Sequence, residues 1–81
     1  MPTTTSAVET AEARRMAGDG RGRTIRERAR LSRAEIAQDL GVHETTVAAW
    51  ETGRWSPRGE MARRYLRLLR VLESAQTDDE Q

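Results

Sequence analysis

The stretch that decides the fold is Leu31-Ser-Arg-Ala-Glu-Ile-Ala-Gln-Asp-Leu-Gly-Val-His-Glu-Thr-Thr-Val-Ala-Ala-Trp-Glu-Thr-Gly53. Ser32 is a candidate N-cap for a first short helix, and Glu35 at the third helical position completes a capping box. Gly41 stands where this helix must end, because glycine adopts the left-handed conformation without a steric penalty. The stretch therefore predicts two short amphipathic helices joined by a tight turn.

Apolar spacing assigns an inner and an outer face to each helix. The first helix carries one apolar stripe, and the second places Val42, Val47 and Trp50 at helical spacing, so these three are expected to face inward. This pattern alone also fits an antiparallel helix pair in any small bundle. The stripe of the first helix consists of Ile36, Ala37 and Leu40, and the residues of the second expected to face outward are Glu44, Thr45, Ala48, Ala49 and Thr52.

The residue types in this stretch resemble those of the Cro/C1-type (Xre-like) helix-turn-helix family. The resemblance covers roughly residues 20–72, and its most specific part is the closing element Trp50-Glu51-x-Gly53. Two positions depart from the family pattern, since His43 stands where serine usually caps the second helix and Arg30 where glycine commonly ends the preceding one. The other matching positions are Leu31-Ser32, Ile36-Ala37, Leu40-Gly41-Val42 and Thr46-Val47.

The resemblance implies an all-α bundle of four or five helices, a lambda-repressor-like DNA-binding domain, with the second helix of the motif in the DNA major groove. It also implies three groups of functional residues. Base edges would be read by Glu44, Thr45 and Ala49, with His43 and Ala48 at the margin; phosphates would be bound by Arg33, Thr46, Arg54 and Arg58, and also by Arg21 and Arg23; Arg26 and Glu51 would form a structural ion pair.

Three segments precede the motif: an N-terminal segment, a glycine-rich run and a short helix. We expect residues 1–19 to form a mobile arm or a weak extra helix over Ala7 to Ala17, with Ser6 as its cap and the first five residues disordered. The glycine-rich run at 18–23 lacks the spacing of a phosphate loop and is interpreted as a linker or helix cap. A helix should follow over about residues 22–30 and bury Ile25 and Ala29.

The segments after the motif begin with a helix start signal. Ser56 as N-cap and Pro57 at the first helical position predict a long helix over about 57–74. Trp55, just before it, is expected to pack under this helix rather than stack on a sugar. The domain should span 20–75, and residues 76–81 should form an acidic disordered tail.

The long helix carries more apolar residues than one small domain can cover. Leu68, Val71 and Leu72 are the candidates left exposed, and we expect them to form the contact of a homodimer. The full set is Met61, Ala62, Tyr65, Leu66, Leu68, Leu69, Val71 and Leu72.

Charge is segregated along the 81 residues. The net charge is only +1, but all 14 basic residues are arginines between residues 14 and 70, and that interval holds seven acids, hence a local net charge of +7. The planar guanidinium of arginine can donate two hydrogen bonds to the oxygens of one phosphate, so this distribution is consistent with nucleic-acid contact. An arginine-only basic set equally fits the codon usage of a GC-rich genome.

Composition excludes several classes of function. There is no cysteine and His43 is the only histidine, so we expect no metal site, no cofactor and no small-molecule ligand. No nucleophile and base can be assembled, and the chain is too short to enclose a pocket, so we expect no enzyme. The absence of an export signal or a long apolar run favours the cytoplasm, either at the bacterial nucleoid or as a phage product in its host.

These observations predict a sequence-specific double-stranded DNA binder that acts as a small transcriptional regulator, of repressor type, on a palindromic operator. Two alternatives stay open at this point. The chain would otherwise be a protein-interaction module, such as an antitoxin-like or phage accessory factor, or a recombination-accessory DNA binder that bends its site with weak sequence preference.

Overall fold

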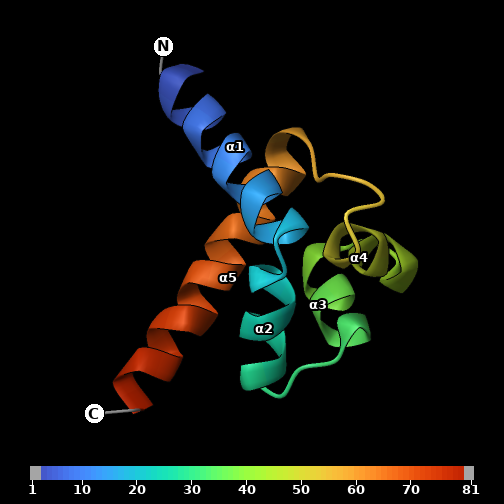
Figure 1. Cartoon of the computed structure of the whole chain (residues 1–81), viewed down its shortest axis with the longest axis vertical. Helices are drawn as coiled ribbons and strands as arrows, with labels where there is room; N and C mark the ends of the chain where they lie inside the picture. Colours follow the sequence, from blue (N-terminus) through green and yellow to red (C-terminus); the bar gives the residue numbers. More distant parts are fainter. Residues whose placement is uncertain (1–2, 80–81) are drawn as a thin grey trace.

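The computed structural model describes residues 3–79, which form five helices (Figure 1). No strand occurs in this part of the chain, so the all-α expectation is confirmed. In Figure 1, α5 runs beside α1 and α2, while α3 and α4 lie together on the other side of α2. The helices are α1 (Thr3–Gly18), α2 (Arg21–Arg28), α3 (Arg33–Leu40), α4 (Glu44–Glu51) and α5 (Gly59–Asp79).

The turn between α3 and α4 follows from the caps that the sequence supplies. The Ser32 hydroxyl accepts from the Glu35 backbone N–H at 3.0 Å, and the Ser32 N–H donates to the Glu35 carboxylate at 2.8 Å, which is the capping box. Gly41 ends α3 with a left-handed φ of 76°. His43 then caps α4, because its Nδ1 accepts from the Thr45 N–H at 3.2 Å. The predicted pair of helices is therefore confirmed.

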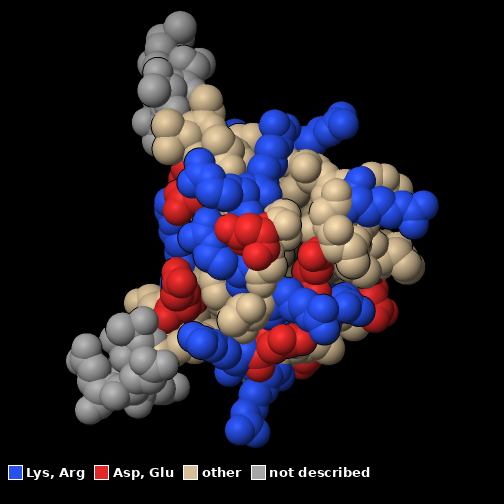
Figure 2. Space-filling view, viewed as in Figure 1, with Lys and Arg blue, Asp and Glu red and all other residues tan. Residues whose placement is uncertain are grey.

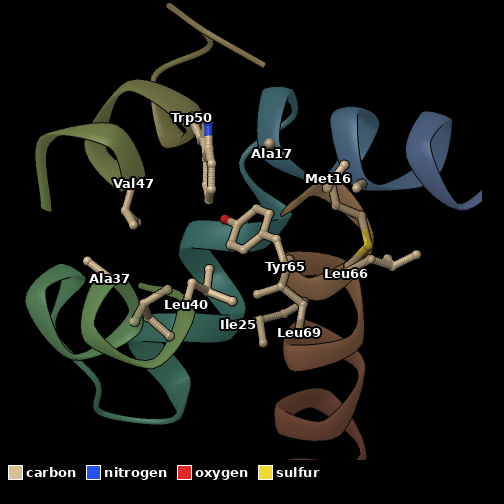
Figure 3. Close-up of a cluster of buried hydrophobic side chains, with 13 residues drawn as sticks. Met16, Ala17, Ile25, Ala37, Leu40, Val47, Trp50, Tyr65, Leu66 and Leu69 are labelled. Carbon is tan, nitrogen blue, oxygen red and sulfur yellow. The ribbon is translucent and has the colours of Figure 1, made fainter. Parts of the chain in front are cut away.

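The core lies between α5 and the shorter helices (Figure 3). Tyr65 is at its centre, and its ring centroid lies 4.8 Å from that of Trp50 with the planes tilted by 45°. This geometry is the offset arrangement that aromatic pairs prefer. The buried apolar residues of the core are Ala13, Met16, Ala17, Ile25, Ile36, Ala37, Leu40, Val47, Trp50, Ala62, Tyr65, Leu66 and Leu69.

Gly22 is required for α2 to approach α5. A Cβ at this buried glycine would lie 2.5 Å from the Tyr65 hydroxyl oxygen, which is closer than real Cβ atoms come. The Tyr65 hydroxyl is itself enclosed, and no group among residues 3–79 forms a hydrogen bond with it. Hence the backbone of α2 and the phenol of α5 meet with no room for a side chain between them.

The N-terminal segment is part of the core rather than a free arm. Helix α1 begins at Thr3, so residues 3–5 are helical and Ser6 lies inside the helix instead of capping it. Alanine and methionine side chains at 13, 16 and 17 are at most 3% exposed because they pack closely on α5. Glu12 pairs with Arg70 across this interface. The disorder expected at residues 1 and 2 lies outside the described residues.

Helix α5 starts later and ends later than expected. Ser56 and Pro57 precede it, since the first helical hydrogen bond runs from the Ala62 N–H to the Arg58 carbonyl at 3.1 Å. Pro57 is instead buried, and its carbonyl accepts from Arg14 Nε at 3.1 Å. At the other end the helix continues through 76–79, where a disordered tail was expected. Gln76 holds this end by donating to the Ile25 carbonyl at 2.9 Å.

Helix α2 is shorter than expected and ends in an unusual conformation. It stops at Arg28, Ile25 is buried as predicted, and Ala29 is only half-buried. Arg30 has a φ of 62° and is the only non-glycine residue with a positive φ among the described residues. Arg30 therefore adopts, despite its Cβ, a backbone conformation that glycine takes without a steric penalty.

Candidate nucleic-acid interface

The exposed face of α4 is its first turn. Glu44 and Thr45 are exposed and Ala48 is half-buried, so these three can be reached from solvent on one side of the helix. The expectation that Ala49 faces outward is wrong, because its side chain is 7% exposed. Ala49 lies at the edge of the apolar stripe, and its carbonyl accepts from the Arg54 N–H at 2.9 Å, which folds the following loop over it.

His43 lies at the start of this face and caps it through Nδ1. Its Nδ1 accepts from the Thr45 backbone N–H, and the Thr45 hydroxyl lies 2.9 Å from the same nitrogen. A neutral imidazole with Nδ1 as acceptor carries its proton on Nε2. The cap therefore leaves an exposed N–H donor beside the first turn of α4.

An ion cluster fixes the C-terminal end of α4 to the two preceding helices. Glu51 has a side chain that is 1% exposed, and it accepts from Arg26 Nε at 2.6 Å and Nη2 at 3.1 Å. Arg26 also donates to the Leu31 carbonyl at 2.8 Å. Hydrogen bonding to Glu51 raises the pKa of the Arg26 guanidinium further above its usual value. The predicted Arg26–Glu51 contact is present in the structure.

Arg33 joins this cluster, which the sequence did not suggest. Its Nε donates to Glu51 at 3.0 Å, while its side chain stays 37% exposed. Arg33 therefore links α3 to the end of α4, with part of the guanidinium still at the surface. Arg21 and Arg23 are exposed and engaged with neighbours in sequence, Asp19 and Glu27 respectively, each at 3.0 Å.

Arg54 and Arg58 are differently placed. Both are exposed, and among the described residues neither guanidinium forms an ion pair. Together with Ser56 they line a hollow between the end of α4 and the start of α5. Thr46, the remaining predicted phosphate contact, is half-buried on α4.

Trp55 does not pack under the long helix as expected. It is 57% exposed, and Arg54 Cζ lies 6.0 Å from its ring centroid, which is a cation–π distance. Pro57, two residues further along the loop, is buried instead. Sequence signals for this exposure were absent, since a tryptophan beside a proline fits either environment.

Arginines cover much of one side of the molecule in mixture with acids. In Figure 2 basic and acidic side chains alternate over the centre, whereas the area at the right, where Figure 1 places α4, is mostly uncharged, with basic and acidic groups at its edges. Within residues 3–79 no three potential ligands gather to hold a metal ion. No helix in the same range has the length and apolar character to cross a membrane.

A capped turn between two short helices, an exposed first turn on the second helix and free arginines beyond it define a helix-turn-helix DNA-binding domain. The comparison with protein families agrees, because the model of the helix-turn-helix domain matches residues 23–78. The chain therefore belongs to the helix-turn-helix domain family. No curated protein and no solved structure matches it.

Proposed function

We propose that this protein binds duplex DNA sequence-specifically through the major groove and regulates transcription by occupying its site. The observation that carries the proposal is the exposed, His43-capped first turn of α4, held on a frame that the Arg26–Glu51–Arg33 cluster makes rigid. In helix-turn-helix domains the N-terminal residues of this helix contact bases.

Base recognition falls to the small set of groups that this turn exposes. Glu44 accepts a hydrogen bond from the amino group of cytosine, and Thr45 and Ala48 place methyl groups against thymine. The Nε2–H of His43 offers a donor to purine acceptors. This face is short and has few long donors, so discrimination between sequences is modest and the arginines supply most of the affinity.

Backbone contacts come from the arginines around the motif. Arg54 and Arg58 bind phosphates beyond the end of α4, since no acid among the described residues competes for them. Arg33 and Thr46 serve the other side of the groove, and Arg21 and Arg23 reach the phosphates only by exchanging their present partners.

The regulator acts as a repressor of the Cro/C1 type and binds as a two-fold dimer. Such dimers place their recognition helices about 34 Å apart, which requires a palindromic operator. Leu68, Val71 and Leu72 on α5 form the dimer contact; Val71 is 66% exposed, while Leu68 and Leu72 are partly buried against the core.

Selection of binding sites from a random duplex pool tests the proposal, followed by titration of the selected duplex at several salt concentrations. We expect a palindromic consensus and a log affinity that falls with log salt by about 0.9 for each phosphate neutralised. Failure to retain any duplex would overturn the proposal in favour of a protein-interaction module. Strong bending with no consensus would overturn it in favour of a recombination-accessory binder.

A further inference from the structure

The hollow beyond α4 brings two tryptophans and two arginines together. It is lined by Trp50 from the last turn of α4, by Arg54, Trp55 and Ser56 from the loop, and by Arg58 just before α5. One side of the hollow is formed by Trp50, a residue of the core. The other side is formed by the loop, which is held to α4 because the Arg54 and Trp55 N–H groups both donate to the Ala49 carbonyl.

Trp50 lines the hollow, and its indole ring carries one N–H donor. The residue is 4% exposed, and Figure 3 shows its ring nitrogen at the end of the side chain remote from Tyr65. Among residues 3–79 no group accepts from Nε1. The Tyr65 hydroxyl is the one fully enclosed side-chain polar atom left unsatisfied there, so Nε1 keeps some access to the surface, and Trp50 is a lining residue of the hollow. Buried indole N–H groups usually find a partner.

Charge around the hollow selects an anion as that partner. Arg54 and Arg58 both line it without a counter-ion in the described chain, and the nearby carboxylate of Glu51 is engaged by Arg26 and Arg33. A donor N–H flanked by two guanidinium groups matches the oxygens of a phosphate.

We infer that the hollow is a subsite for one backbone phosphodiester of duplex DNA, which accepts from Trp50 Nε1–H and pairs with Arg54 and Arg58. The exposed ring of Trp55 packs against the deoxyribose next to that phosphate, which gives its apolar face a partner that a free phosphate ion would not supply. This inference rests on the proposed DNA binding and names a contact point for it beyond the end of α4.

The indole N–H resonances of the full chain test the donor directly. Trp50 and Trp55 are the only tryptophans, so in the Trp55→Phe variant the single indole N–H belongs to Trp50. We expect a mixed-sequence DNA duplex to move this resonance downfield and to slow its exchange with water. Inorganic phosphate, added alone at the same phosphate concentration, should leave it nearly unmoved.

Binding measurements separate the charged from the apolar contacts. Arg58→Gln should reduce the salt slope of duplex binding by about 0.9, whereas Trp55→Ala should weaken binding about tenfold and leave the slope unchanged. Arg15→Gln, an exposed arginine on α1 outside the hollow, is the matched control and should preserve the slope. Thermal melting of each variant verifies that it is folded.

The outcomes distinguish the inference from the function on which it rests. If the wild-type chain binds no duplex, the proposed function fails and the subsite with it. If the wild type binds while the Trp50 resonance stays in place and the Arg58 and Trp55 variants match the Arg15 control, the subsite is refuted and the function stands. A response to inorganic phosphate as large as that to duplex would reduce the site to a general anion pocket and overturn the inference.

Discussion

Tyr65 makes the stability of this protein depend on alkaline pH. Burial raises the pKa of its phenol above the usual 10.0, and the charge of Glu51 adds to the shift. Below about pH 10 both folded and unfolded chains hold the phenolic proton and the full stability is present. Above it the unfolded chain loses the proton first, so stability should fall by up to about 1.4 kcal/mol per pH unit until the folded pKa is reached.

Urea unfolding at pH values from about 8 to 11 measures this fall in stability. The chain has one tyrosine and no lysine or cysteine, so few other groups titrate in that range. Tyr65→Phe is the control, and its unfolding midpoint should change much less with pH. Equal slopes for the two proteins would show that the phenol is not the group responsible.

Arg30 holds a conformation that glycine adopts without strain. A left-handed backbone costs a residue with a Cβ about 1 to 2 kcal/mol, and part of this is offset because arginine loses less backbone entropy on folding than glycine. Arg30→Gly should therefore raise the free energy of unfolding by about 0.5 to 1 kcal/mol. Chemical denaturation checks it against Arg30→Ala, which removes the same charge but keeps the Cβ and should give no gain.

At the scale of elements, the packing of α2 on α5 depends on the absence of a side chain at Gly22. Gly22→Ala should lower the free energy of unfolding by about 1 to 3 kcal/mol, because the new methyl group would overlap the Tyr65 hydroxyl. Removing that hydroxyl in the Gly22→Ala, Tyr65→Phe double variant should restore most of the loss. Additive effects in this double-mutant cycle would contradict the proposed clash.

The cluster at the end of α4 joins three helices through one carboxylate. Glu51→Ala should destabilise the fold by about 3 to 5 kcal/mol, since Arg26 would keep a buried charge with no partner. Glu60→Ala is a matched control because it removes a carboxylate from an exposed pair with Arg63 and should cost less than about 1 kcal/mol. Thermal unfolding of Glu51→Ala indistinguishable from wild type would argue against the structural role.

Local signals in the sequence predicted the elements wherever the deciding contacts are local. The Ser32–Glu35 box, the Gly41 turn and the inward positions of Val47 and Trp50 involve neighbours within one or two turns, and all were predicted correctly. Ala49 and Trp55 were not, because their exposure depends on how the loop after α4 folds back onto the Ala49 carbonyl. The spacing of apolar residues along α4 carries no information on how that loop folds.

At the scale of the whole molecule, α1 was the helix that the sequence predicted least clearly. It has few large apolar residues, yet Ala13 and Ala17 are almost fully buried because small side chains let α1 lie close to α5. The match to the helix-turn-helix family begins at residue 23, after α1, and α1 covers one side of α5 while another side stays open. Which side of α5 remained free could not be predicted without placing α1.

The open side of α5 carries an apolar groove with charged residues among its lining. Leu40, Leu68 and Val71 line it, with Asp39 from α3 and Arg64 and Arg67 from α5 at its edges. A second copy related by a two-fold axis would present the same apolar strip, so each strip would cover the other. This arrangement supports the proposed dimer through α5.

Val71→Asp should therefore dissociate the proposed dimer, because it places a charge in the apolar strip. Sedimentation equilibrium should show the monomer mass at concentrations where the wild type is dimeric, and affinity for a palindromic duplex should fall much more than affinity for a single half-site. Val8→Asp, at an exposed valine on α1 that is not among the groove residues, is the control and should leave both properties unchanged. The comparison between whole site and half-site is decisive, since loss of the dimer removes only the coupling between two half-sites, whereas damage to the fold would weaken both.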